Sequence, residues 1–319
     1  MKKILTGIMA VAVLLFSAGC EKIIEFKGDV TEPRLTLSSY AEVGEPLTVY
    51  VASSIFFLSD QKYGRAFTEG LDTTRGSVRC FVNGSNTPCE LQLVPGADVS
   101  SLCYRDPSYA PAPGDHIRLE AEFPGFDPVW AETDVPLMPA FEVVSAQWRL
   151  TDMSDWVDID DDWVLYDLDL TLAVTDDGKY DKYYYLQPIT IYQSEWAEEN
   201  YTVFYSFSSN DIIFKEMSGG NALSLLNRYG GYFSDELIKG QRHTFTITIS
   251  EISDREDILY FGLIASTVNE HLYWYDVSYQ QTLSAMGGLF GEGATLYSNV
   301  HGGYGFFAAS APVLLDVEW

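Results

Sequence analysis

The chain is short of positive charge. Its 319 residues include 19 lysines and arginines against 46 aspartates and glutamates, which gives a formal net charge of -27. Contacts to nucleic-acid phosphates need clustered Lys and Arg, so a nucleic-acid-binding function is excluded. No stretch reaches 18 apolar residues, so no membrane-spanning helix is predicted. The 47% hydrophobic and 14% aromatic content nevertheless indicates a folded chain with a large core, not a disordered one.

Sequence motifs for catalysis are also missing. There is no His-Glu-x-x-His pair, no Gly-x-Ser-x-Gly elbow and no phosphate-binding loop. The four histidines lie far apart in the sequence, which favours separate structural roles over a shared zinc site: His116, His243, His271 and His301. The sequence therefore assigns no catalytic residue and no cofactor.

An acidic run offers the one weak metal candidate. Asp158, Asp160 and Asp162 repeat the first three ligand positions of a helix–loop–helix calcium site. The glycine required at the sixth position is Trp163, and the twelfth position is Asp169, within a predicted strand. A regular calcium loop is thus excluded. An irregular calcium site and a solvated acidic loop both remain open.

The N-terminus has the pattern of a lipoprotein signal peptide. Lys2 and Lys3 precede an apolar stretch over 4–16, too short to span a membrane, and small residues at 17–19 lead to Cys20. This order predicts cleavage after residue 19, with diacylglycerol and a palmitate-type acyl chain on Cys20. Several acyl chains make such an anchor effectively permanent.

The sequence after the signal peptide predicts a tether and a first β-domain. Residues 20–33 have no sustained periodicity. Residues 34–136 contain short segments in which apolar and polar residues alternate, as in strands with one buried face. Turn dipeptides separate these segments and predict an Ig-like antiparallel β-sandwich: Asn83-Gly84, Pro95-Gly96, Pro113-Gly114 and Pro124-Gly125.

A second β-rich domain is predicted over 140–319, after a proline-containing linker. Clear alternation recurs at 163–174 and 244–249, whereas 268–286 has the spacing of an amphipathic helix. A short helix is also expected at 222–227. The helical spacing directs four side chains toward the core: Leu272, Tyr275, Tyr279 and Leu283. The predicted fold class is all-β, mainly antiparallel, with a few short helices.

Three cysteines remain in the exported chain, enough for one disulfide. A two-residue turn at 83–84 places Cys80 opposite Thr87 and away from Cys89. This register favours a Cys89–Cys103 disulfide. Centring the turn one residue later would instead pair Cys80 with Cys89, and that alternative stays open.

Several segments, in order, resemble a known family of bacterial lipoproteins. Besides the acylation signal they are Pro33-Arg-Leu-Thr-Leu, Gly76-Ser-Val-Arg, Val82-Asn-Gly, Pro113-Gly-Asp-His-Ile-Arg-Leu-Glu-Ala, Ala131-Glu-Thr-Asp-Val-Pro, Tyr232-Phe-Ser-Asp and Asn299-Val-His-Gly-Gly-Tyr-Gly-Phe-Phe. Together they resemble the Bacteroidota lipoproteins of domain-of-unknown-function family 4249. The resemblance implies an outer-membrane lipoprotein, often encoded beside a TonB-dependent receptor, and it brings no established catalytic residues.

These observations favour a protein that works by binding, as an accessory partner of a TonB-dependent transporter. The predicted helix and the glycine-rich loop after it supply candidate contact residues in Tyr273, Trp274 and Phe290, although these rings could equally pack on the adjoining sheet. An envelope hydrolase built from distant acidic residues and a structural or adhesive surface protein are the alternatives. The sequence leaves open which face of the outer membrane the protein occupies.

Overall fold

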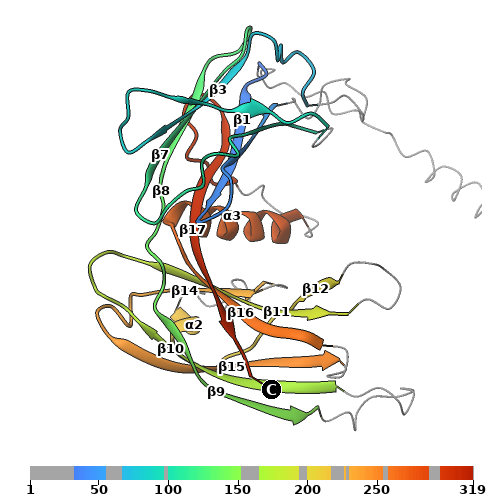
Figure 1. Cartoon of the computed structure of the whole chain (residues 1–319), viewed down its shortest axis with the longest axis vertical. Helices are drawn as coiled ribbons and strands as arrows, with labels where there is room; N and C mark the ends of the chain where they lie inside the picture. Colours follow the sequence, from blue (N-terminus) through green and yellow to red (C-terminus); the bar gives the residue numbers. More distant parts are fainter. Residues whose placement is uncertain are drawn as a thin grey trace, which may run out of the picture.

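The protein folds into two β-sandwiches joined end to end, the first at the top of Figure 1 and the second at the bottom. The prediction of a mainly antiparallel all-β fold is confirmed. No helix in the described part of the chain is long and apolar enough to cross a membrane. The structure is a computed structural model, and it describes residues 32–54, 67–96, 100–151, 165–193, 200–216, 226–227, 230–253, 258–286 and 295–318.

The first sandwich packs two antiparallel groups of strands face to face. One group consists of β1 (Leu35–Glu42), β2 (Thr48–Ser53), β6 (Leu102–Arg105) and β5 (Gln92–Leu93). The other consists of β4 (Cys89–Glu90), β3 (Ser77–Val82), β7 (His116–Glu122) and β8 (Val129–Asp134).

The second sandwich has the same plan with longer strands. One of its layers contains β13 (Leu226–Asn227), β14 (Gly230–Ser234), β11 (Tyr183–Tyr192), β12 (Tyr201–Phe204) and β16 (Ile258–Val268). This layer is part of a ten-stranded sheet that continues into the β1 group of the first sandwich. The other layer of the second sandwich contains β15 (Arg242–Ser253), β10 (Leu165–Thr175) and β9 (Phe141–Leu150). Two helices, α2 (Ile213–Glu216) and α3 (Glu270–Met286), and the last strand, β17 (Tyr304–Asp316), complete the fold.

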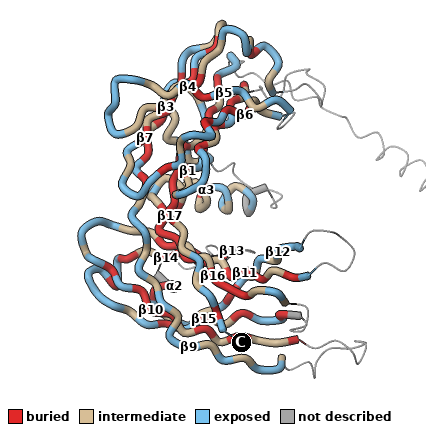
Figure 2. The backbone as a smooth tube through the Cα atoms, viewed as in Figure 1, coloured by how far each residue is buried: buried red, intermediate tan, exposed pale blue. Residues whose placement is uncertain are grey.

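Alternation explains how the second core is filled along β10. From Leu168 to Val174 every second side chain is fully buried, and Leu168, Leu170 and Leu172 lie opposite Ile249, Ile247 and Phe245 of β15 in the antiparallel register. Cross-strand apolar pairs of this kind stabilise a sheet and fix its register, because a slip of one residue would turn every buried side chain to solvent. Figure 2 shows buried positions along the strands of both sandwiches and exposed positions in many of the connecting segments.

The last strand, β17, belongs to both sandwiches. Its first half pairs in parallel with β1, from Tyr304 opposite Thr36 to Ser310 opposite Glu42. Its second half pairs antiparallel with β16. The odd-numbered side chains point inward throughout: Phe307 and Ala309 enter the first core, and Val313, Leu315 and Val317 pack on the second. The predicted passage between domains near 136–140 lies between β8 and β9, while the end of the predicted second domain returns to the first sandwich.

The glycines around the start of β17 pack closely against neighbouring backbone. A Cβ atom on Gly303 or Gly305 would lie 2.2 Å or less from a backbone oxygen of β1, and one on Gly302 would lie 2.5 Å from the carbonyl oxygen of Pro128, just before β8. Only glycine therefore lets this segment run between β1 and β8. Asn299 holds the turn closed, because its side-chain amide donates to the carbonyl of Phe307 (2.9 Å) and its Oδ1 accepts from the amide of the same residue (2.8 Å).

Helix α3 begins at the junction of the two sandwiches. Asn269 caps it, since its Oδ1 accepts a hydrogen bond from the amide of Leu272 (3.1 Å). The same oxygen accepts from the amide of Ala309 in β17, and the Asn269 side-chain nitrogen donates to Oγ1 of Thr133 in β8 at 2.6 Å. One side chain thus fixes the start of the helix against strands of the first sandwich.

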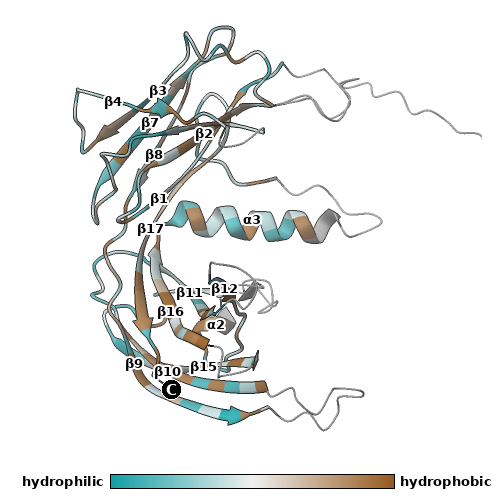
Figure 3. Ribbon diagram, turned by 45° about the vertical axis from the view of Figure 1, so that its right-hand side comes forward, coloured by the Kyte–Doolittle hydropathy of each residue, from teal (hydrophilic) through white to brown (hydrophobic). Residues whose placement is uncertain are grey.

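The predicted core-facing side of α3 is only partly correct. Tyr275 stacks on Phe306 of β17 with 3.8 Å between ring centroids, but Tyr279 and Leu283 are 43% and 47% exposed. The reason is that α3 projects from between the sandwiches, so that only its first turns have strands to pack against (Figure 3). The short helix predicted at 222–227 is wrong for its last two residues, because Leu226–Asn227 forms the short strand β13. The other residues of that prediction lie outside the described residues.

The cysteine register differs from the expected one. The turn at 83–84 forms, with both residues at positive φ, yet Cys80 lies opposite Cys89 in the β3–β4 ladder. The two-residue difference arises because Ser85 and Thr87 fold back on each other through two 3.1 Å hydrogen bonds. The favoured Cys89–Cys103 pairing is not formed: Cys80, Cys89 and Cys103 are all free thiols.

Candidate functional site

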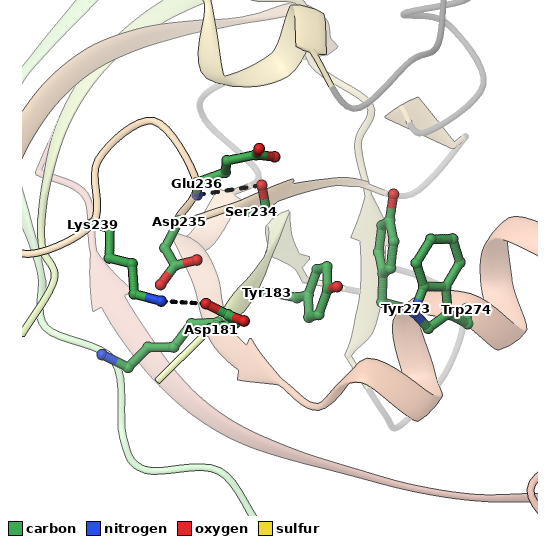
Figure 4. Close-up of a pocket in the computed structure, with 9 residues that line it drawn as sticks. Asp181, Tyr183, Ser234, Asp235, Glu236, Lys239, Tyr273 and Trp274 are labelled. Carbon is green, nitrogen blue, oxygen red and sulfur yellow. Dashed lines mark hydrogen bonds and ion pairs between the residues drawn. The ribbon is translucent and has the colours of Figure 1, made fainter. Parts of the chain in front are cut away.

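An open cavity of about 420 Å³ lies where the second sandwich meets α3 (Figure 4). Three separate segments surround it: the connection from β10 into β11, the connection from β14 toward β15, and the first turns of α3. Its walls combine rings with charged groups, namely Asp181, Lys182, Tyr183, Ser234, Asp235, Glu236, Lys239, Tyr273 and Trp274. Because strand ends and a capped helix hold these residues, the cavity is built on ordered elements.

The aromatic wall consists of three rings. Tyr183, the first residue of β11, stacks on Tyr273 of α3 with ring centroids 4.4 Å apart and planes inclined by 11°. Trp274 meets Tyr273 edge to face at 5.0 Å. Tyr273 is buried by these contacts, whereas Trp274 remains 44% exposed. Burial raises the pKa of the Tyr273 hydroxyl to about 12, so this ring is a neutral packing group.

The two lysines of the cavity are already paired with carboxylates. Lys239 forms an ion pair with Asp181. Lys182 lies 2.9 Å from Oδ2 of Asp176 and also pairs with Asp177. Neither lysine is therefore a free cation that would attract an anionic ligand.

Asp176 is a structural carboxylate beneath the cavity. Its oxygens accept from the amides of Gly178 (2.7 Å) and Gly240 (2.8 Å), from Nζ of Lys182 and from the hydroxyl of Tyr184 (3.0 Å). Burial alone would raise the pKa of this carboxyl, but the four donors outweigh it and lower the pKa to about 2. Asp176 thereby holds together the two turns that carry the charged wall.

Asp235 differs from Asp176 because one of its carboxyl oxygens lacks a donor. The residue is only 3% exposed, and its Oδ2 has no hydrogen-bond partner among the described residues. Burial raises the pKa of this carboxyl, and the nearby charges of Asp176 and Asp181 raise it further. A hydrogen bond from the backbone amide of Lys182 and the positive charge of Lys239 act in the opposite direction. A buried polar atom without a partner is uncommon in folded proteins and calls for an explanation.

Two of the residues proposed from the sequence for partner contact lie in this cavity, Tyr273 and Trp274. Phe290, the acidic candidates Asp158, Asp160 and Asp162, and the acylation site Cys20 lie outside the described residues. Tyr183 belongs to a run of three tyrosines at 183–185, which together with residues 273–275 is among the densest aromatic clusters of the sequence and could line a groove. Sequence reasoning missed Asp181 and Asp235. The signal for Asp235 was indirect, because it ends one of the segments behind the family resemblance.

The four histidines have separate partners in the structure. His116 lies 2.8 Å from Asp134, His243 lies 3.0 Å from Asp211, and His271 lies 2.8 Å from the hydroxyl of Tyr297. His301 stacks on Trp130. Within the described ranges, no group of three or more His, Cys, Asp or Glu side chains is arranged to hold a metal ion.

Comparison with known proteins adds little to this description. No protein-family model matches the sequence. No curated protein matches it either. Among solved structures, the chain is similar to the I-band fragment I67–I69 from titin, with 6% sequence identity, 91% of this chain and 100% of that chain covered, and a TM-score of 0.20.

Proposed function

We propose that this protein is an outer-membrane lipoprotein that works by binding, as an accessory partner of a TonB-dependent transporter, and that the cavity beside α3 contacts the partner. The observation that carries the binding function is the exposed Trp274, held next to buried rings and acidic side chains at the junction of two sandwiches. Exposed Trp side chains backed by packed rings are typical of the residues that contribute most to protein interfaces.

The charge states of the nearby acids favour binding over hydrolysis. A hydrolase of the kind considered above needs two accessible carboxyl groups, one protonated and one ionised. Asp235 and Asp176 have pKa values shifted in opposite directions, but both oxygens of Asp176 are occupied by four donors within the fold. The pair therefore offers no free ionised carboxylate to a substrate.

The test is copurification of the full-length, acylated protein from detergent-solubilised membranes. We expect the wild type to recover a transporter of the outer membrane and Trp274→Ala to recover much less, at an unchanged melting temperature. Tyr50→Ala is the matched control, because Tyr50 is similarly exposed, at 41%, but lies on β2 of the first sandwich. Equal recovery by Trp274→Ala and Tyr50→Ala would exclude the cavity as the contact, and the absence of any transporter with the wild type would exclude the accessory role.

A further inference from the structure

One oxygen of the Asp235 carboxylate, Oδ2, has no hydrogen-bond partner among the described residues, and this oxygen identifies the kind of group that the cavity lacks. Removing a carboxylate from water without supplying donors is costly, and the fold supplies donors to Asp176 but leaves Oδ2 of Asp235 without one. The lysines that could have served are held by other acids, Lys239 by Asp181 and Lys182 by Asp176 and Asp177. Among the described residues, therefore, no donor reaches this oxygen.

The balance of charge around the cavity selects a cationic donor. Five carboxylates stand within the cavity wall or directly behind it, against two lysines: Asp176, Asp177, Asp181, Asp235 and Glu236 against Lys182 and Lys239. A neutral hydroxyl could fill the vacant hydrogen bond but would leave this excess negative charge uncompensated. A charged N–H donor satisfies the hydrogen bond and the charge together, and such charge-assisted bonds are about twice as strong as neutral ones.

The aromatic rings of the cavity indicate that the cationic group of the ligand is carried on an apolar stem. Figure 4 shows Asp235 on one side of the cavity, Tyr183 in the middle, and Tyr273 with Trp274 on the other side. Ring faces stabilise a neighbouring ammonium group and also cover an apolar stem. A ligand that reaches Asp235 past Tyr183 and Trp274 thus needs a positive head and an aliphatic arm.

We infer that the cavity binds a primary alkylammonium group, which donates to Oδ2 of Asp235 while its alkyl arm lies against Tyr183 and Trp274. This inference rests on the proposed binding function and names the chemical group that the cavity takes. A lysine side chain on a protein partner and a small free amine share this chemistry. Protonation of Asp235 removes the negative charge that holds the ammonium group, so binding weakens as the pH falls through the raised pKa of this carboxyl. The groups that influence this pKa are Asp176, Asp181, Lys182 and Lys239.

The first experiment is an NMR titration of the full chain with two probes that share a four-carbon side chain and differ in the terminal ammonium group, Nα-acetyl-lysine amide and Nα-acetyl-norleucine amide. We expect the lysine probe to bind about tenfold more tightly, and Asp235→Asn to reduce that preference to less than about twofold. Asp127→Asn is the control, since it removes the same charge from a loop of the first sandwich. Equal binding of the two probes, or a preference that survives Asp235→Asn, would overturn the inference.

Two further measurements keep the test decisive. If Asp235→Asn lowers the melting temperature, Trp274→Leu in the otherwise native cavity should still weaken the lysine probe, and an unchanged affinity would count against the site. Butylammonium compared with butanol separates the two sources: binding of butylammonium without the lysine probe assigns the site to small amines. A further outcome is that Trp274→Ala loses the transporter while the native protein shows no preference for the charged probe. That combination would support the proposed function and refute only the inference that the cavity binds an alkylammonium group.

Discussion

The two sandwiches share a plan but fill their cores differently. The first core is mainly aliphatic, with Leu, Val, Ile and Ala from β1, β2, β3, β7 and β8. The second core is rich in rings: Tyr184, Phe207, Phe214, Phe233, Phe245 and Phe261. A smaller cluster of Tyr232, Val268 and Tyr273 continues this aromatic packing from the second sandwich to α3. The candidate cavity lies where that packing reaches solvent, so the binding surface is an extension of the core beneath it.

The largest expected loss of stability comes from a substitution in β17, the strand that the two sandwiches share. Phe307→Ala should destabilise the protein by about 3–5 kcal/mol, because it removes a fully buried ring and leaves a cavity in the first core. Chemical denaturation measures the loss. Native-state hydrogen exchange should show the amides of β1 exchanging faster than those of β10.

The control for Phe307→Ala is Val313→Ala on the same inward side of β17. Val313 is only partly buried and packs on the second core, so the effect should be smaller and should appear first in β16. If each substitution speeds hydrogen exchange equally in both sandwiches, the two cores unfold as one cooperative unit, and the two sandwiches are separate in structure but not in stability.

A second prediction concerns the carboxylate that supports the cavity. Asp176→Asn should cost roughly 2 to 3 kcal/mol at neutral pH, which corresponds to a pKa lowered from 3.8 to about 2 at about 1.4 kcal/mol per unit. Since the folded-state pKa is depressed, this stability is present above the unfolded-state pKa and is lost as the pH falls toward about 2. The stability of the wild type should therefore decline between pH 5 and 2 more steeply than that of Asp176→Asn. Parallel declines would show that the four hydrogen bonds do not stabilise the ionised form.

These regions also differ in how far their structure could be predicted. The alternation of β10 and the turn at 83–84 are local signals, and both elements form as expected. The pairing of β17 with β1 depends on contacts between residues more than 250 positions apart, such as Tyr40 with Ser310, and no local pattern specifies that partner. The cavity was only half predicted for the same reason: Trp274 and Tyr273 are adjacent in sequence, whereas Asp181 and Asp235 reach them through sheet topology.

A third prediction sharpens the account of the first sandwich. Because Cys80 faces Cys89 across antiparallel strands, oxidised glutathione should convert their two thiols into one disulfide and release two molecules of reduced glutathione. Formation should be slow, since a hydrogen bond to Asp106 and burial raise the pKa of Cys89 to about 11, and Asp106→Asn should accelerate it. The short loop implies a gain of about 2 kcal/mol. Peptide mapping that links Cys89 to Cys103 would contradict the observed register.

The smallest expected effect separates the inner and outer halves of α3, the helix between the sandwiches. Tyr279→Gln should change the free energy of unfolding by less than about 0.5 kcal/mol, because this ring is 43% exposed and, among the described residues, its ring contact is with its helical neighbour Tyr275. Tyr275→Gln should cost more, since Tyr275 stacks on Phe306 of β17. The sequence pattern alone predicts similar losses for both, as it places both on the core side. Denaturation midpoints of the two variants distinguish these cases, and equal losses would mean that the outer half of α3 packs against the protein after all.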